Sequence, residues 1–395
     1  MASSSPRIAI VFGTRPEAIK LAPVVRAARA FADWRVDVWS TGQHRGLVDG
    51  VAAELELAAD VALQTMRGGQ SLASLSARLL DALDPALTSR APTWLIVQGD
   101  TTTAMIAALA GFYRQARVAH VEAGLRTGDR RAPFPEEVNR ALVGRLADLH
   151  LAPTPRARAA LVAEGIDPAA IEVTGNTVVD ALRWIVGRLP ADGAPPPGAG
   201  LERFAAASGR RLVLVTGHRR ESFAGGLAAI CDGLAALAGR WPGVDFVYPV
   251  HLNPAVQEAV RGRLGGLENV HLIDPVGYSA AIWLLRRARF VITDSGGIQE
   301  EAPELGKPAL VTRVATERPE ALEQGYARLV AYDAPAMIEA ADLWLRDPAA
   351  YAAVCPTPGA GPFGDGRAAE RCVAALRRRL GLTPTYRGEE APPWP

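Results

Sequence analysis

Carboxylates follow two predicted strands in the first half of the chain, and another begins a predicted helix. Asp100 and Glu122 come just after the apolar runs 94–97 and 118–121, and Glu136 follows soon after them. Loops at the carboxyl ends of parallel strands are where α/β proteins bind ligands and place catalytic groups. Carboxylates held near arginines suit acid–base chemistry on an anionic substrate.

Structural roles are the alternative interpretation of these side chains. Asp100 could cap a helix, and Glu136 could complement a helix dipole. Glu137 and Arg140 could form a solvated pair on the helix surface. Glu122 stands apart, because a charge one residue beyond a buried strand is not expected without a purpose.

Two other strand ends carry residues suited to binding an anion. The segment Gly13–Lys20 would direct backbone N–H groups, Arg15 and Lys20 toward a ligand. Lys20 is one of only two lysines among 43 basic residues. This fits a specific use for its compact ammonium, and it fits equally well a chance position on a helix surface. After the run 212–216, His218 precedes two arginines, which favours a phosphate partner over a purely structural imidazole.

The sharpest anion motif is the segment Asp294–Ala302, which follows the predicted strand 290–293. Two glycines let backbone N–H groups approach a phosphate at a helix N-terminus, and a serine adds a hydroxyl. A glutamate one turn further could accept from ribose hydroxyls. The chain lacks both the Walker-loop and the G-x-G-x-x-G spacing, so no nicotinamide cofactor is expected. The candidate residues here are Ser295, Gly296, Gly297, Glu301 and, after the next strand, Arg318.

Composition excludes several classes of protein. The 395 residues are too many for one ordinary core and fit two domains. A net charge of +1 argues against nucleic acid or a membrane surface as a partner. The three cysteines are widely spaced and form neither a disulfide framework nor a metal cluster, so a cytoplasmic setting is expected. We find no signal peptide and no run long enough to span a membrane.

Short apolar runs alternate with helix-period segments along the chain. This alternation predicts an α/β protein with two doubly wound, Rossmann-like domains. The anion motifs of both halves, with the carboxylates, predict an interdomain cleft for the ligand. Helices are expected over 17–31, 72–83 and 226–237, among others. The predicted strands are 8–12, 36–40, 94–97, 118–121, 149–152 and 171–173, then 212–216, 246–250, 270–273, 290–293, 309–311 and 329–331.

Proline and glycine mark the expected domain boundaries. The stretch 189–200 predicts a linker between an N-terminal domain, 1–188, and a C-terminal nucleotide-binding domain, 201–365. A helix within 366–381 is expected to pack back on the first domain. The proline-rich tail, 382–395, is expected to be disordered.

At these residues the chain resembles the non-hydrolysing UDP-N-acetylglucosamine 2-epimerase family. Eight motifs in family order, from residue 8 to about 330, make the resemblance specific. They are Gly13–Glu17, Thr41–Arg45, Gly99–Thr102, His120–Thr127, Pro135–Arg140, Gly217–Ser222, Asp294–Ala302 and Thr316–Glu320.

The resemblance implies a fold of the glycosyltransferase-B type and a cytoplasmic homodimer. It implies that UDP-GlcNAc and UDP-ManNAc interconvert through elimination of UDP to a 2-acetamidoglucal and its re-addition, with no cofactor and no metal. The catalytic positions it implies are Asp100, Glu122, Glu136 and His218. The substrate-binding positions it implies are Arg15, Lys20, Ser295, Gly296, Gly297, Glu301 and Arg318.

Some members of the family are regulated by a second UDP-GlcNAc, and Gln43, Arg219 and His251 are the candidate regulatory positions here. Near the expected uracil site, Val276 and Ala281 are small and apolar where members commonly carry polar and aromatic residues. Contacts to the base would then rest on backbone groups.

Other functions fit the same motifs less well. A 2-epimerase acting on a UDP-diacetamido-uronic acid shares most of them. A hydrolysing epimerase would need a different loop after Glu122, and a glycosyltransferase would not need three clustered carboxylates. A catalytically silent UDP-sugar sensor is disfavoured because all three carboxylates are present.

Overall fold

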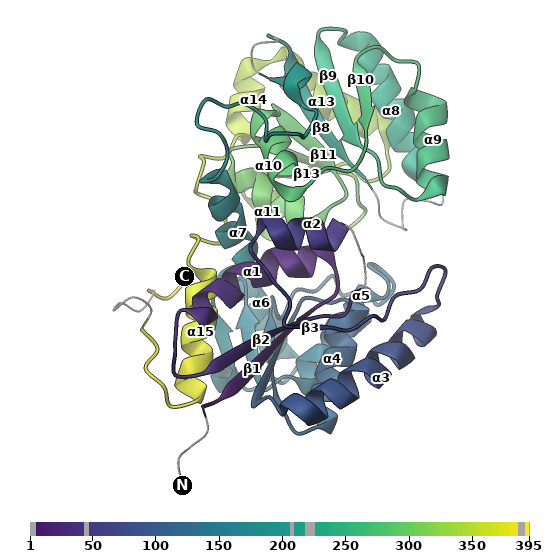
Figure 1. Ribbon diagram of the computed structural model, residues 1–395. Coiled ribbons are helices and arrows are strands. Elements are labelled where there is room, and N and C mark those ends of the chain that lie inside the picture. The colour runs from purple at the N-terminus through teal and green to yellow at the C-terminus, as the bar shows by residue number, and fades with distance from the viewer. Residues whose placement is uncertain (1–4, 43–46, 206–208, 218–225, 386–391, 395) are drawn as a thin grey trace. The chain divides into compact units, whose positions relative to one another are not determined.

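The chain forms two compact units in a computed structural model that describes residues 5–42, 47–205, 209–217, 226–385 and 392–394. The first unit is Met1–Arg183 with Phe363–Pro395, and the second is Trp184–Pro362. Each unit contains one parallel sheet accompanied by helices (Figure 1). The predicted α/β class with two parallel sheets is confirmed.

The first unit is built on a seven-stranded sheet of order β3-β2-β1-β4-β5-β6-β7. Helix α7 begins in this unit and continues into the second. The strands are β1 (Arg7–Phe12), β2 (Arg35–Ser40), β3 (Val61–Ala62), β4 (Trp94–Gln98), β5 (Arg117–Val121), β6 (Leu149–Ala152) and β7 (Ile171–Val173). The helices are α1 (Arg15–Arg29), α2 (Leu47–Glu54), α3 (Leu72–Arg90), α4 (Thr102–Tyr113), α5 (Glu136–Leu146), α6 (Pro155–Ala163), α7 (Thr177–Val186) and α15 (Ala368–Arg379).

The second unit is built on a six-stranded sheet of order β10-β9-β8-β11-β12-β13. The strands are β8 (Arg211–Thr216), β9 (Val244–Pro249), β10 (Val270–Ile273), β11 (Phe290–Thr293), β12 (Ala309–Val311) and β13 (Ala327–Leu329). The helices are α8 (Gly226–Arg240), α9 (Pro254–Leu264), α10 (Tyr278–Arg287), α11 (Gly296–Glu304), α12 (Pro319–Glu323), α13 (Ala334–Arg346) and α14 (Pro348–Val354).

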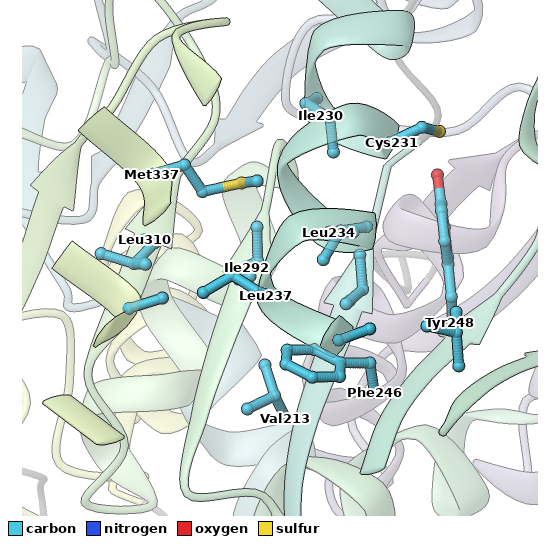
Figure 2. Packing of buried hydrophobic residues seen from close by; sticks show 14 of the residues in the cluster. Val213, Ile230, Cys231, Leu234, Leu237, Phe246, Tyr248, Ile292, Leu310 and Met337 are labelled. Atoms are coloured by element: carbon cyan, nitrogen blue, oxygen red, sulfur yellow. The ribbon is translucent and has the colours of Figure 1, made fainter. Parts of the chain in front are cut away.

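The core of the second unit shows how apolar periodicity fixes a helix on a sheet. Leu234 of α8 lies near Val213 and Phe246 of the central strands, and all three are buried (Figure 2). A Cβ at Gly233 would lie 2.3 Å from the terminal methyl of Met337, so the Met337 side chain fills the space that the glycine leaves between α8 and α13. The packed helices hold the carboxyl ends of β8 and β11 in place.

The C-terminal segment returns to the first unit, where α15 packs against α1. The Asp180 carboxylate of α7 accepts hydrogen bonds from the backbone N–H groups of Ala368 and Ala369, at 3.2 and 2.9 Å. At the other end of α15, the guanidinium of Arg377 forms two hydrogen bonds of 2.7 Å with Asp33. The returning helix is therefore tied to the unit at both of its ends.

The stretch 189–200, predicted as a linker, lies within the second unit. The carbonyl of Gly193 accepts a hydrogen bond from the indole of Trp283 at 2.9 Å, which ties the stretch to α10. The division between the two units falls inside α7, between Arg183 and Trp184, and the helix is continuous across it. Of the tail expected to be disordered, residues 386–391 and 395 lie outside the described residues.

Some elements differ from the sequence-based prediction. Helix α3 continues past Pro85 to Arg90 instead of ending near residue 83, because Leu83 and Leu87 remain buried and offset the lost hydrogen bond. A strand was predicted over 329–331, but β13 ends at Leu329. The φ of 48° at Ala331 is not compatible with a strand. The short strand β3 was not predicted, because two residues carry no periodicity.

Candidate active site

Each sheet has one point at which strand order reverses, between β1 and β4 in the first unit and between β8 and β11 in the second. Ligands of open α/β sheets bind beyond the carboxyl ends of the strands at such points. The carboxylate motifs follow β4 and β5, and the glycine motif follows β11. The two groups of candidate residues thus occupy the position that this fold class uses for ligands.

Glu122 lies immediately beyond β5 and is nearly buried, with 8% of its surface exposed. The ammonium of Lys20, on α1, forms a salt bridge with its Oε2. The side-chain amide of Asn176, between β7 and α7, donates to the same oxygen at 2.8 Å. Lys20, for which an anion contact was predicted, pairs with the central carboxylate, and the predicted contact to a substrate stays a prediction.

The backbone at Glu122 is in the left-handed region, with a φ of 64°. Such a conformation is uncommon for a residue with a side chain, and it persists only where the surroundings impose it. Those surroundings include Gly124, with a φ of 92°, at which a Cβ would lie 2.2 Å from the carbonyl oxygen of Ala157. The turn after β5 is thus pressed against α6, which directs the Glu122 side chain toward Lys20.

Asp100 is held by the helix that carries Glu136. Its carboxylate forms a salt bridge with Arg140, and its carbonyl accepts from the side chain of Asn139 at 2.9 Å. Asp100 does not cap α4, because Thr101 is the capping residue and accepts from the N–H of Ala104. The structural alternative for Asp100 was therefore wrong.

The pair of Glu137 and Arg140 is buried, not solvated as the sequence had suggested. Their relative exposures are 5% and 3%, and Arg140 Nη1 lies 2.9 Å from Glu137 Oε2. Glu137 also accepts from the backbone N–H groups of Thr127 and Gly128, at distances of 3.0 to 3.2 Å. It thereby fixes the loop after β5 to α5 while holding the arginine against Asp100.

Glu17 joins the loops after β1 and β4. Its carboxylate accepts from the backbone N–H groups of Gly13 and Thr14 and from the hydroxyl of Thr101, at 2.7 to 3.0 Å. Burial raises the pKa of Glu17 despite these lowering hydrogen bonds. Sequence reasoning missed Glu17 and Asn176 as members of this region, because Thr101 and Glu122, to which they bind, follow other strands.

The remaining candidates of the first unit are placed by their elements. Glu136 is the first residue of α5, half-buried and one turn before Arg140. Arg15 is the first residue of α1, half-buried at the end of the loop that follows β1. Gln43 lies outside the described residues. None of these positions tests the roles that were predicted for them.

Two histidines stand side by side beneath this site, in register on β5 and β6. His120 and His150 are almost completely buried, and Nε2 of His120 lies 2.7 Å from the carbonyl oxygen of Gly99. Burial lowers the pKa of His120 to about 3 and that of His150 to about 4. Both imidazoles are therefore neutral in the folded protein near pH 7.

We expect these histidines to make the protein less stable as the pH falls below about 6.5, the ordinary pKa of histidine. Unfolding returns both rings to water, so the unfolded chain binds more protons than the folded one between that pH and about 4. Each histidine then lowers the free energy of unfolding by about 1.4 kcal/mol per pH unit. Asp180 has the opposite effect on stability. Burial raises its pKa to about 7, so the folded chain binds this proton more tightly than the unfolded chain does. The resulting contribution to the free energy of unfolding is lost as the pH rises from about 4 to 7.

A comparison of the wild type with His150→Gln isolates one histidine from these opposing trends. We expect the free energy of unfolding of the wild type, relative to the variant, to fall steadily between pH 6.5 and pH 4.5. Urea unfolding followed by circular dichroism at several pH values would measure it. A difference that does not change with pH would contradict the assignment.

In the second unit, the strand ends that precede the glycine motif are linked by hydroxyl groups. The side-chain oxygens of Thr216 and Thr293 lie 2.6 Å apart, which joins β8 to β11. The hydroxyl oxygen of Thr293 also accepts from the N–H of Ser295 at 3.0 Å. Ser295 is the residue before α11, and its own side chain does not cap that helix. These hydrogen bonds fix the position of the N-terminus of α11 relative to β8 and β11.

Arg318 lies against the start of α11. A Cβ at Gly296 would be 2.6 Å from Arg318 Nη1, so only glycine leaves room for the guanidinium. The guanidinium is buried between Glu300, 2.6 Å from Nε, and Glu317, 2.5 Å from Nη1. Arg313, which also follows β12, pairs with Glu317 at 2.7 Å and is buried.

Glu301 and a neighbouring cavity complete this region. The hydroxyl of Tyr278, the first residue of α10, donates to Glu301 Oε1 at 2.7 Å. A cavity of about 380 Å³ lies before α10 and is lined by Gly198–Leu201, Ile273–Gly277 and Ala280. Five of its ten lining residues are glycine or alanine.

We expect Gly297→Ala to weaken nucleotide binding without weakening the fold. A Cβ at Gly297 would meet only the Ser295 hydroxyl, at 4.0 Å, so the empty protein has room for it. Alanine in place of a helical glycine adds about 0.5–1 kcal/mol of stability. The methyl group would nevertheless occupy the space through which a phosphate approaches the N–H groups.

Calorimetric titration with UDP should show at least tenfold weaker binding by Gly297→Ala, while its melting temperature is unchanged or higher. Gly239→Ala is the matched control, since Gly239 also lies in a helix with open space at its Cβ position. Unchanged UDP affinity in Gly297→Ala would argue against the phosphate site.

The other candidates of the second unit are only partly described. His251 is exposed after β9, and its ring Nδ1 accepts from the N–H of Asn253 at 3.1 Å. His218 and Arg219 lie outside the described residues. Within the described ranges, no group of three or more His, Cys, Asp or Glu side chains could hold a metal ion. No helix in that part of the chain is long and apolar enough to cross a membrane.

Comparison with known proteins decides the family. The sequence model of a family described as UDP-N-acetylglucosamine 2-epimerase matches residues 26–377. The UDP-N-acetylglucosamine 2-epimerase of Yersinia pestis is 46% identical over 373 residues, which is 94% of this chain and 98% of that protein. The chain belongs to the UDP-N-acetylglucosamine 2-epimerase family. The family predicted from the eight motifs is confirmed, and with it the class of isomerases.

Solved structures agree with this membership. A UDP-GlcNAc 2-epimerase from Neisseria meningitidis, bound to UDP-GlcNAc, is 37% identical with a TM-score of 0.88, and the match covers 94% of this chain and 100% of that one. The glycosyltransferase SnogD from Streptomyces nogalater has a TM-score of 0.56 at 18% identity, over 95% of this chain and 99% of that one. That second likeness concerns the fold alone, and it agrees with the predicted glycosyltransferase-B type.

Proposed function

We propose that this protein interconverts UDP-GlcNAc and UDP-ManNAc by epimerisation at C2, with no redox cofactor. The observation that carries the proposal is the Glu122 carboxylate, buried at a strand end and held by Lys20 and Asn176. A charge in this position, on backbone in the left-handed region, is unfavourable for folding and so is expected to serve a reaction. Family membership supplies the substrate class.

The chemistry that we propose needs the groups present in the two units. A base removes the C2 proton while the C1–O bond breaks, so the electron pair of the C2–H bond forms the C1=C2 double bond and UDP departs with the C1–O pair. In the return step, a UDP oxygen adds to C1, and an acid delivers a proton to the opposite face of C2. The acid–base groups are drawn from Asp100, Glu122 and Glu136, with His218 as a further candidate.

The two faces of C2 explain why several carboxylates are needed. One group takes the proton from one face, and another supplies a proton to the other face. Arg140 and Lys20 keep two of these side chains in fixed positions at neutral pH. The second unit is assigned the nucleotide, with the α11 N-terminus and Arg318 suited to the negative charge that grows on departing UDP. Arg15 and Glu301 remain proposed substrate contacts.

The test is proton NMR of the purified protein with UDP-GlcNAc in D2O, with nothing else added. We expect UDP-ManNAc to appear, and both epimers to carry deuterium at C2. Release of free UDP and ManNAc would indicate a hydrolysing enzyme instead. Absence of any change would overturn the substrate assignment, and the same assay with a UDP-diacetamido-uronic acid would then be the next measurement.

We also propose that the protein is a cytoplasmic homodimer. All three cysteines are free thiols, as suits a reducing compartment. Phe112 and Tyr113, at the end of α4, are 58% and 65% exposed, and Leu142 on α5 is 46% exposed. Exposed apolar side chains on packed helices suit a surface between two subunits. Light scattering on the purified protein would give a mass twice that of one chain.

A further inference from the structure

We propose that Asn176 is a positioning residue for the Glu122 carboxylate and that the returning C-terminal segment fixes it there. The inference rests on the proposed epimerase function, in which Glu122 transfers a proton. Asn176 lies between β7 and α7, far along the chain from both β5 and the C-terminus.

Two donors of different character hold the same oxygen of Glu122. The Lys20 ammonium and the Asn176 amide both donate to Oε2, the amide at 2.8 Å. The other oxygen, Oε1, faces the loop after β4, since a Cβ at Gly99 would lie 3.9 Å from it. That loop carries Asp100. The arrangement therefore turns Oε1 toward the side of the site where the second carboxylate lies.

The amide contributes something that the ammonium cannot. An ammonium is a compact point charge whose three hydrogens rotate, so it attracts a carboxylate without setting the angle of its plane. A side-chain amide is planar, and its N–H donates in a fixed direction. Lys20 thus compensates the charge of Glu122, whereas Asn176 sets the rotation of the carboxylate and with it the position of Oε1.

Asn176 is itself held on two sides. Its Oδ1 accepts from the N–H of Val178 at 3.1 Å, which orients the amide group toward Glu122 through Nδ2. Its backbone N–H donates to the carbonyl of Phe363 at 2.6 Å. The side chain is 2% exposed, so water does not replace either bond. The amide consequently has a single orientation in the folded protein.

The backbone hydrogen bond to Phe363 is one of several contacts that the returning C-terminal segment makes around Asn176. A Cβ at Gly364 would lie 3.2 Å from the carbonyl oxygen of Asn176, which shows how closely the two stretches pack. Arg371 of α15 donates to the carbonyl of Thr174 at 3.1 Å. With the hydrogen bonds from α15 to Asp180, the returning segment therefore binds the chain both before and after Asn176. The C-terminal segment therefore fixes the position of Asn176, and through it the Glu122 carboxylate, in addition to packing against the first unit.

The experiment compares Asn176→Asp with the wild type. Aspartate keeps the shape and the acceptor for Val178, but it presents a carboxylate where Glu122 needs a donor. We expect kcat to fall about 10²-fold, the size typical of a lost outer contact to a reacting group. The KM for UDP-GlcNAc and the affinity for UDP should change little. The acid limb of the pH–kcat profile should move to higher pH, because two neighbouring carboxylates, Glu122 and the new side chain at position 176, hold a proton more readily than Glu122 alone.

Asn253→Asp is the matched control. The Asn253 side chain accepts from the N–H of Ala255 at 3.0 Å, the same local bond two residues on, but at the exposed start of α9. We expect this variant to retain wild-type kcat and pH profile. Wild-type kcat with an unmoved acid limb in Asn176→Asp would overturn the inference. Failure of the wild type itself to convert UDP-GlcNAc would instead refute the proposed function.

A measurement on the wild type covers the case in which Asn176→Asp does not fold. The chain has only four asparagines, so selective ¹⁵N-asparagine labelling gives four pairs of side-chain amide signals. We expect one pair to shift with pH at the midpoint of the acid limb of kcat, and to lose that response in Glu122→Gln. Four pairs that ignore this midpoint would contradict a bond between Asn176 and the reacting carboxylate.

Discussion

Replacing Glu122 with glutamine is expected to lower kcat for epimerisation by about 10³-fold, within the range measured for positioned acid–base groups. Glutamine keeps the size of the side chain and an oxygen that can accept from Asn176 or Lys20. It cannot take up the proton from C2. The KM for UDP-GlcNAc should change far less than kcat, because the nucleotide is assigned to the second unit.

Exchange of the C2 proton separates this effect from a general loss of structure. In D2O, the variant should lose deuterium incorporation into UDP-GlcNAc together with turnover, while calorimetry shows that UDP still binds. Glu172→Gln is the matched control, since Glu172 lies on β7 of the same unit and pairs with Arg378 at 3.3 Å near the surface. If Glu122→Gln kept more than a tenth of wild-type kcat, Glu122 would not be an essential acid–base group.

Replacing Lys20 with methionine is expected to remove both activity and stability. The methionine fills a similar volume but leaves the Glu122 carboxylate without its ammonium in a site where both partners are at most 8% exposed. Removing one partner of a buried ion pair typically costs about 3–5 kcal/mol, because the remaining charge is uncompensated. We expect a loss of unfolding free energy of this size and at least a 10²-fold fall in kcat.

The double variant Lys20→Met/Glu122→Gln gives this prediction its sharpest test. With both charges removed, the desolvation penalty disappears, so the double variant should recover most of the stability lost by Lys20→Met. Its activity should stay as low as that of Glu122→Gln alone. Urea unfolding and kcat on all four proteins complete the cycle. Additive losses of stability would mean that the two side chains do not act as a pair.

The order of elements and the location of both candidate sites were available from the sequence. Apolar periodicity is a local property, so strands such as β6 and β11 could be placed to the residue. The glycine motif after β11 indicated its own chemistry, because paired glycines between a strand and a helix are typical of a phosphate-binding turn. Proline was less informative, as α3 shows by continuing through Pro85 to complete its buried face.

The partners of the charged side chains could not be predicted in the same way. Lys20 and Glu122 are separated by 102 positions, and Asn176 and Glu122 by 54. Arg140 looked like a surface residue, since its helix spacing with Glu137 is equally common in solvent. Its burial depends on how α5 packs against the loop after β4, which no local pattern encodes.

The sequence alone therefore determined which residues stand at the carboxyl ends of the strands, and through its motifs the family to which the chain belongs. Tertiary structure alone decided which of those residues meet. It turned Glu122 into the left-handed region beside α6, gave Lys20 a carboxylate as its partner, and brought the C-terminal segment against Asn176. The physical reason is that periodicity and turn chemistry act over a few neighbouring residues, whereas hydrogen bonds and ion pairs in a buried site are set by packing between elements far apart in the chain.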